Sequence, residues 1–198
     1  MLVLASASPR RRELLVQAGF DFQVHPTHIP EDPRPGEEPI SYVTRLAREK
    51  AQAAFSQLAD SSQATQNLVV LGADTTVTLD GHILGKPEDA ADAARILRLL
   101  SGRSHRVVTG IAVVTATSAE VAAEVTAVQF LGLSDAEIET YIATGEPMDK
   151  AGAYGIQGRA ARWIPRIEGC YFNVVGLPLA LVATMLETRS GTRYLAGK

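Results

Sequence analysis

Short apolar runs alternate with longer amphipathic stretches along this chain. Leu68-Val69-Val70-Leu71 is continuously apolar and predicts a strand that is buried on both faces and ends near Asp74-Thr75. Asp80-Gly81 separates two β-type runs and favours the tight turn of a hairpin. The pattern places strands at residues 2–5, 20–24, 68–71, 76–79, 82–84, 106–115 and 121–130.

Amphipathic segments between these strands predict helices. Ser8-Pro9 is a typical helix start, because serine caps free N–H groups and proline suits the first turn. Ser134 and Glu137 form a capping box that opens a later helix. Further helices are expected at residues 41–58 and 89–100, and a last helix is expected to end near Glu187. Long hairpins interrupt the alternation of strands and helices, which predicts a mixed α/β sheet.

The composition is that of an ordinary globular protein, with 46% hydrophobic and 21% charged residues in 198. A net charge of −3 argues against a nucleic-acid polymer as partner. The short apolar run at the N-terminus resembles neither a signal peptide nor a membrane span, so no membrane association is expected. The single Cys170 excludes an internal disulfide and favours a cytoplasmic location, and we expect it to be a small buried hydrophobe.

Three arginines follow Ser8-Pro9 in the first turn of the expected helix. The positive end of the helix dipole disfavours cations there, so Arg10, Arg11 and Arg12 break a local rule. Free N–H groups and guanidinium donors together favour an anion, and phosphate is the obvious ligand. The alternative is a solvated basic turn whose arginines point to water or pair with acids such as Glu13.

Lys50 projects beside the apolar stripe of the helix expected at residues 41–58, which contains Ala47 and Ala54. In one interpretation its stem packs on the protein and its ammonium reaches water. In the other it faces a cleft and contacts phosphate as a point charge.

Asp74 follows the apolar run at residues 68–71, and ligand sites in open α/β sheets lie beyond the carboxyl ends of strands. Its carboxylate is therefore a candidate to hold a divalent ion or to activate water. Glu31 lies in a proline-rich acidic loop at residues 25–39 and could complete such a site. The alternatives are an aspartate that caps its own turn and a solvated glutamate.

Two further segments carry candidate ligands. Lys86 lies between Gly85 and Pro87, which permit close approach and fix the backbone, and this arrangement suits a phosphate. Gln157, in a glycine-rich stretch at residues 152–158, offers one amide donor and one acceptor that match O4 and N3–H of uracil or thymine. A surface lysine and an ordinary glycine-rich turn are the alternatives.

Taken in order, these segments resemble the Maf family of nucleotide pyrophosphatases, over residues 2–187. The segment Tyr154-Gly155-Ile156-Gln157-Gly158 resembles the subgroup that acts on dTTP and UTP. Thr76 departs from the family pattern, in which valine or isoleucine is more usual. The matching motifs are Ser6-Ala7-Ser8-Pro9-Arg10-Arg11, Glu31, Arg48-Glu49-Lys50-Ala51, Gly72-Ala73-Asp74-Thr75, Gly85-Lys86-Pro87, residues 149–158 and Asn173-Val174-Val175-Gly176-Leu177-Pro178.

The resemblance implies an elongated mixed β-sheet with flanking helices and two lobes around a deep cleft, similar to the inosine triphosphatase family. It implies a single domain at residues 1–188, followed by a C-terminal tail at residues 189–198. It also implies hydrolysis of a nucleoside triphosphate to the monophosphate and pyrophosphate, with Mg²⁺ or Mn²⁺.

By the same resemblance, Asp74 and Glu31 are catalytic residues and metal ligands, and Arg12 has no assigned role. The implied phosphate ligands are Ser8, Arg10, Arg11, Lys50 and Lys86. The implied specificity positions are Arg10, Thr75 and Gln157.

Two alternative functions stay open at this point. One is the same reaction on another base, such as 7-methyl-GTP. The other is a nucleotide-binding regulator of septum formation and cell division without significant turnover, which would need the arginines but not Asp74. The resemblance is also compatible with a homodimer.

Overall fold

The computed structural model describes residues 1–61 and 67–190. The chain divides into two compact units: unit 1 comprises residues 1–74, 109–124 and the chain from residue 176 onward, and unit 2 comprises residues 75–108 and 125–175. Of the expected C-terminal tail, Arg189 and Ser190 still belong to the last helix, and the remainder lies outside the described residues. The expected cleft between two lobes stays a prediction.

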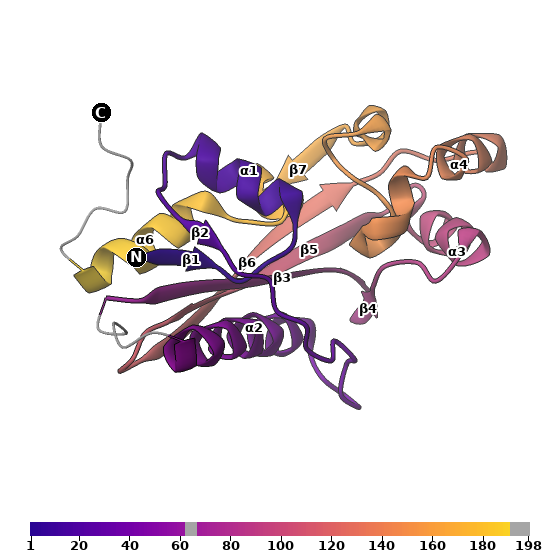
Figure 1. Ribbon diagram of the computed structural model, residues 1–198. Coiled ribbons are helices and arrows are strands. Elements are labelled where there is room, and N and C mark those ends of the chain that lie inside the picture. Colours follow the sequence, from indigo (N-terminus) through magenta and orange to yellow (C-terminus); the bar gives the residue numbers. More distant parts are fainter. Residues whose placement is uncertain (62–66, 191–198) are drawn as a thin grey trace. The chain divides into compact units, whose positions relative to one another are not determined.

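The strands form one mixed seven-stranded sheet in the order β2-β1-β3-β5-β6-β7, with β4 paired to β3 (Figure 1). β1 pairs in parallel with β2 and β3, whereas the β3–β4 and β6–β7 pairs are antiparallel. The expected mixed α/β sheet is therefore confirmed. The strands are β1 (Leu2–Leu4), β2 (Gln23–Val24), β3 (Val69–Leu79), β4 (His82–Leu84), β5 (Ser104–Val114), β6 (Ala119–Gln129) and β7 (Arg166–Glu168).

Helices flank this sheet, and both expected caps are present. The Ser8 hydroxyl accepts the Arg11 backbone N–H, and Ser134 and Glu137 form the capping box. In the described residues, every helix is too short or too polar to cross a bilayer. The helices are α1 (Pro9–Gln17), α2 (Pro39–Ser61), α3 (Ala90–Leu100), α4 (Asp135–Ile142), α5 (Tyr171–Val175) and α6 (Leu179–Ser190), with 3-10 turns η1 (Glu146–Asp149), η2 (Ala151–Ala153) and η3 (Arg159–Trp163).

In unit 1, α2 packs directly on the backbone of β3 and β5. A Cβ atom at Gly72 would lie 2.1 Å from the carbonyl oxygen of Ala47, and one at Gly110 would lie 2.4 Å from that of Val43. Glycine at both positions therefore lets the helix approach the sheet closely. This approach fixes the position of Lys50, which follows Ala47 by about one helical turn.

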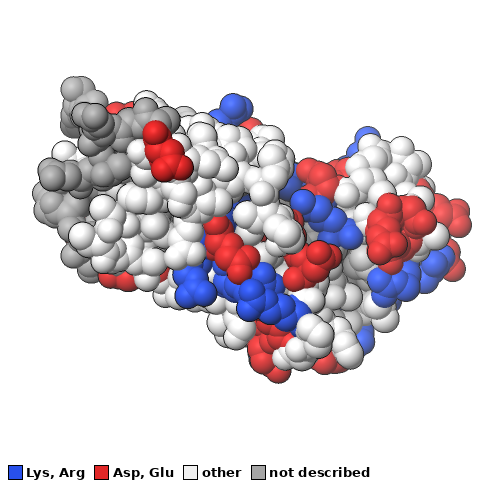
Figure 2. All heavy atoms as spheres, turned by 60° about the horizontal axis from the view of Figure 1, so that its bottom comes forward, with Lys and Arg blue, Asp and Glu red and all other residues white. Residues whose placement is uncertain are grey.

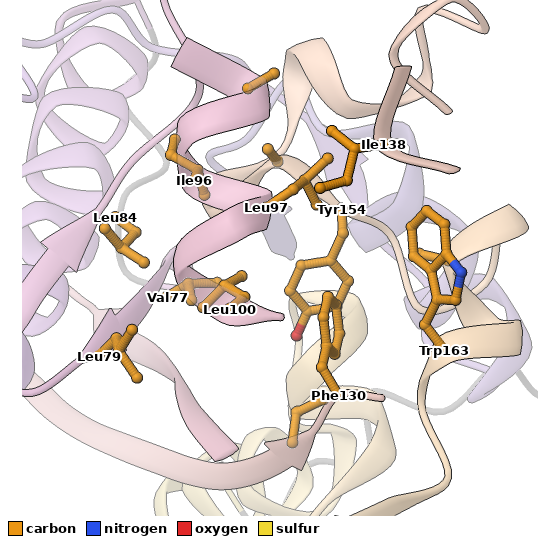
Figure 3. Packing of buried hydrophobic residues seen from close by; sticks show 14 of the residues in the cluster. Val77, Leu79, Leu84, Ile96, Leu97, Leu100, Phe130, Ile138, Tyr154 and Trp163 are labelled. Carbon is orange, nitrogen blue, oxygen red and sulfur yellow. The ribbon is translucent and has the colours of Figure 1, made fainter. Parts of the chain in front are cut away.

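Unit 2 has a core of aliphatic and aromatic side chains (Figure 3). Leu97 of α3 and Ile138 of α4 belong to this cluster, as does Tyr154 from the glycine-rich segment. The rings of Phe130 and Tyr154 meet edge to face with centroids 4.8 Å apart, an arrangement that aromatic pairs favour. The glycine-rich segment is thus anchored in the core through Tyr154.

β3 differs from the sequence prediction in a way that affects the site. It runs without interruption through Asp74 to Leu79, whereas the apolar run predicted an end near Asp74. The threonines and valine that follow Asp74 favour a strand, and the buried carboxylate is paired with Lys50, so the strand continues. Neighbouring β1, however, ends at Leu4, opposite Leu71. Asp74 therefore lies beyond the end of β1 but inside β3.

Other boundaries also shifted. α2 begins at Pro39 rather than at Ser41, because proline fits the first helical turn. β2 is limited to Gln23–Val24. The expected loop at residues 149–158 contains the 3-10 turn η2, and the sequence pattern gave no signal for the short elements β7 and α5. Cys170 is half-buried rather than buried.

Candidate active site

Arg11 turns back from the first turn of α1 and binds the backbone of unit 1. Its Nε donates to the carbonyl oxygen of Gly176 at 2.9 Å, and its Nη1 donates to that of Ala73 at 2.9 Å and to Ser6 Oγ at 3.2 Å. Burial lowers the pKa of this guanidinium, and the nearby charge of Asp74 acts in the opposite direction. The basic turn is therefore not simply solvated at this residue, because Arg11 ties α1 to the backbone beside Asp74.

The other two arginines lie in different surroundings. Arg12 is exposed. Arg10 is half-buried and close enough to Arg11 to affect its pKa. Ser8 caps the helix through its hydroxyl. The roles of Ser8, Arg10 and Arg11 as phosphate ligands stay predictions.

Lys50, Asp74 and Glu31 form the central charged group of unit 1. The Lys50 ammonium lies 2.7 Å from Asp74 Oδ1 and 2.6 Å from Glu31 Oε1. The side chains of Lys50 and Asp74 are each 10% exposed, whereas that of Glu31 is 47% exposed. Lys50 therefore does not reach into open solvent, and two carboxylates from distant segments share its charge.

The carboxyl of Asp74 is buried, and its surroundings shift its pKa. Burial raises the pKa of its carboxyl above the ordinary value, while the Lys50 and Arg11 charges act in the opposite direction. A base works best when its pKa approaches the operating pH, so a raised value suits proton abstraction from water. The location on a continuous strand holds this carboxylate more firmly than a loop would.

Glu31 is held by side chains of α2 that the sequence did not single out. The Tyr42 hydroxyl donates to the Glu31 carbonyl oxygen at 2.8 Å, and Arg45 Nη2 donates to the Asp32 carbonyl oxygen at 3.2 Å. Arg45 also contacts both oxygens of Glu37 at 2.6 and 2.7 Å and lowers the pKa of that carboxyl to about 2. One helix thus carries Lys50 and also fixes the loop that brings Glu31 to it.

The donor set fits a magnesium-type cation. Mg²⁺ is typically held by one or two carboxylates, together with water and substrate phosphate oxygens. Asp74 and Glu31 supply two carboxylates that already enclose a cationic ammonium. Within residues 1–61 and 67–190, no cluster of three or more acidic, histidine or cysteine side chains offers a complete protein cage. A cation held by these two carboxylates would take its other ligands from water or from a bound phosphate.

The remaining candidates, Thr75, Lys86 and Gln157, belong to unit 2, and Thr75 directly follows Asp74 in β3. Thr75 is half-buried, while Lys86 and Gln157 are exposed. The Gly152 N–H donates to the carbonyl oxygen of Gly85 at 3.0 Å, which joins the end of the hairpin to the glycine-rich segment. The structure therefore brings the segments of Lys86 and Gln157 together.

Charges of both signs are interspersed on the face drawn in Figure 2. Basic and acidic side chains alternate there, as expected for a net charge of −3. Among its described residues, this face therefore presents no continuous basic surface of the kind that binds a long polyanion.

The fold is shared with a protein of low sequence identity. The Ham1 protein of Staphylococcus aureus aligns over 96% of this chain and 99% of its own, with a TM-score of 0.51 and 14% identity. This likeness supports the expected mixed-sheet fold of the inosine triphosphatase type.

Sequence comparisons identify closer relatives. A protein of Koribacter versatilis named dTTP/UTP pyrophosphatase is 52% identical, over 94% of this chain and 93% of its own length. A protein of the same name from Geobacter sp. strain M21 is 53% identical over 94% of each chain. The family described as Maf-like protein matches residues 1–189. This chain therefore belongs to the Maf family.

Proposed function

We propose that the protein is a nucleoside triphosphate pyrophosphatase that converts dTTP and UTP to the monophosphate and pyrophosphate. The observation that carries the proposal is the buried Asp74 carboxylate, whose raised pKa suits a general base and which lies beside the Lys50 ammonium. The choice of substrate is supported by relatives that share about half of their aligned residues with this chain and are named dTTP/UTP pyrophosphatase.

In this proposal, Asp74 accepts a proton from a water molecule, and the water oxygen forms a bond to phosphorus. The bond from that phosphorus to the bridging oxygen of the α–β anhydride breaks, and the electron pair leaves with the departing phosphate group. Negative charge grows on the phosphate oxygens during this step, so nearby fixed cations lower the barrier. Lys50 supplies such a charge beside Asp74, and Arg10, Arg11 and Lys86 are proposed as further phosphate ligands, with Ser8 at the helix start.

We also propose that Asp74 and Glu31 hold a divalent cation, Mg²⁺ or Mn²⁺. A bound divalent cation would neutralise triphosphate charge and orient the reacting phosphate. Lys50 then holds the two carboxylates close together when the cation is absent. Base selection is assigned to Arg10, Thr75 and Gln157, of which Gln157 has the donor and acceptor that uracil and thymine require.

A substrate panel tests the proposed function. Pyrophosphate release is measured for dTTP, UTP, CTP, GTP, ATP and 7-methyl-GTP with Mg²⁺ and with Mn²⁺. The highest kcat/KM is expected for dTTP and UTP. Release from 7-methyl-GTP alone would contradict the substrate assignment. Binding without release from any nucleotide would contradict the enzyme assignment and support a regulatory binding protein.

The charge of Lys50 should set the pH dependence of turnover. Asp74 must be ionised to act as a base, so activity is present above its folded-state pKa and is lost as the pH falls through it. Because burial raises this pKa, the acidic limb should lie above the ordinary aspartate value of about 3.9. Lys50→Met removes a charge that lowers the pKa, so the limb should move to higher pH.

The measurement is kcat against pH at saturating UTP, so that the titration of the nucleotide is common to all variants. Lys50→Arg serves as the matched control, because it keeps the positive charge and should keep the limb near its wild-type position. An unchanged limb in Lys50→Met would exclude electrostatic control of Asp74 by Lys50.

Gln157→Glu should weaken the preference for uracil and thymine. A carboxylate keeps the acceptor for N3–H but has no N–H to donate to O4, so kcat/KM for UTP should fall about 10-fold relative to that for CTP. The comparison of the two substrates under the same conditions is the measurement. An unchanged ratio would show that the base is selected by other residues.

A cytoplasmic location is proposed from the lone Cys170 and from the nucleotide substrate. A homodimer stays a prediction from the family resemblance, which sedimentation of the purified protein checks.

A further inference from the structure

We propose that Tyr141 and Glu146 are positioning residues for base selection, because they fix the backbone segment that carries Gln157. This inference rests on the proposed function and deepens it by naming what holds the specificity residue in place. All the contacts that carry it lie within unit 2.

The Glu146 carboxylate holds the far end of the segment. It accepts the backbone N–H of Arg159 on both oxygens, at 3.2 Å for Oε1 and 3.1 Å for Oε2. Its Oε1 also accepts the Tyr141 hydroxyl at 2.8 Å. The half-buried Glu146 carboxylate therefore accepts hydrogen bonds from other groups of the protein. One of these groups is the backbone N–H of Arg159, two residues after Gln157.

The Tyr141 hydroxyl holds the near end of the segment. It accepts the backbone N–H of Gly155 at 3.2 Å while it donates to Glu146. The Tyr141 ring is buried and meets Trp163 edge to face with centroids 5.1 Å apart, so the hydroxyl has a fixed location. One hydroxyl and one carboxylate therefore hold the backbone on both sides of Gln157.

Two glycines allow this clamp to close. A Cβ atom at Gly158 would lie 1.9 Å from Glu146 Oε1, and one at Gly155 would lie 2.8 Å from Lys150 Cε. Lys150 in turn donates to the carbonyl oxygen of Glu146 at 2.6 Å. A side chain at Gly158 would therefore displace the Glu146 carboxylate from its place in the clamp.

Gln157 depends on its backbone for its placement. Its side chain is exposed, and among the described residues it makes no hydrogen bond. A glutamine amide that is free to turn over can match uracil or cytosine, because turning exchanges its donor and its acceptor. Discrimination between these bases therefore requires the amide to hold one orientation at the right place beside the base, and the clamp supplies the place by fixing the backbone from which the amide extends.

Tyr141→Phe tests the inference, since it removes the bridging hydroxyl and keeps the buried ring. The readout is the ratio of kcat/KM for UTP to that for CTP, which a merely structural loss of active protein would not change. The substitution removes the hydrogen bond to the Glu146 carboxylate and the one from the Gly155 N–H, and it should lower the ratio about 5-fold. In a Gln157→Ala background the same substitution should leave the ratio unchanged, because the clamp acts through Gln157.

Tyr171→Phe is the matched control, because this tyrosine is 41% exposed and belongs to the same unit. Gly158→Ala is the second variant, and it should reproduce the loss of selectivity by displacing the Glu146 carboxylate. A wild-type ratio in folded Tyr141→Phe and Gly158→Ala would overturn the clamp while leaving UTP hydrolysis, and hence the proposed function, intact. A fall that persists in the Gln157→Ala background would also overturn it. Absence of UTP hydrolysis by the wild-type protein would instead refute the proposed function.

Discussion

Asp74→Asn should lower kcat for UTP about 1,000-fold, the usual effect of removing a general base. The asparagine amide has nearly the same shape but cannot take up the proton from water. Nucleotide binding should persist, because the phosphate ligands are retained and a negative charge near the triphosphate is removed. Turnover is followed by pyrophosphate release, and binding is followed by calorimetry of the variant with UTP.

Asp80→Asn provides the matched control. Asp80 is an exposed residue of the β3–β4 hairpin, pairs with Arg103 at 2.6 Å and has no proposed role in the site. The same change of carboxylate to amide should leave kcat within a factor of about two, since exposed ion pairs contribute little. A kcat within 10-fold of wild type for Asp74→Asn would remove this residue from the proposed proton transfer.

Gly72→Ala should lower the free energy of unfolding by about 3 kcal/mol and also reduce turnover. The added Cβ atom would lie 2.1 Å from the Ala47 carbonyl oxygen and 2.9 Å from the Ala51 side chain. Because the contact is with the backbone, α2 must move away from β3. Lys50 would move with α2 and away from Asp74, so kcat should fall in protein that remains folded.

Gly132→Ala is the control for this prediction, because a Cβ atom there meets no atom within 4 Å. Denaturant unfolding of the two variants and the wild-type protein measures the difference directly. Equal stability of Gly72→Ala and Gly132→Ala would show that α2 tolerates displacement from the sheet.

The strongest local patterns predicted the fold best. Leu68-Val69-Val70-Leu71 and the Asp80-Gly81 turn identify their elements because the signal lies within a few neighbouring residues. The continuation of β3 through Asp74 could not be predicted in this way. A carboxylate inside a buried strand is tolerated only with a partner, and that partner, Lys50, lies 24 residues earlier in the chain.

The same distinction applies to the site. Helical periodicity placed Lys50 beside the apolar stripe. Whether its ammonium reaches solvent or forms a buried ion pair depends on where Asp74 and Glu31 lie, and the local pattern does not contain this information. Arg11 was expected to bind anions, and its bonds to backbone carbonyl oxygens depend on residues far along the chain. Tyr42 and Glu146 belong to no sequence motif that indicates a function. Their hydrogen bonds to backbone groups of distant residues therefore could not be predicted from the sequence.

The bond from Arg11 to Gly176 spans 165 positions of the chain. Ribosomal synthesis proceeds from the N-terminus, and domains generally fold as their residues emerge. The first 74 residues contain Lys50, Asp74 and Glu31 but lack the carbonyl oxygen of Gly176. A nascent chain of 74 residues therefore has the Ser6 and Ala73 partners of Arg11, and it gains the Gly176 partner only after residue 176 has left the ribosome. The contact that joins the first helix of unit 1 to the segment at Gly176 is thus formed late in synthesis.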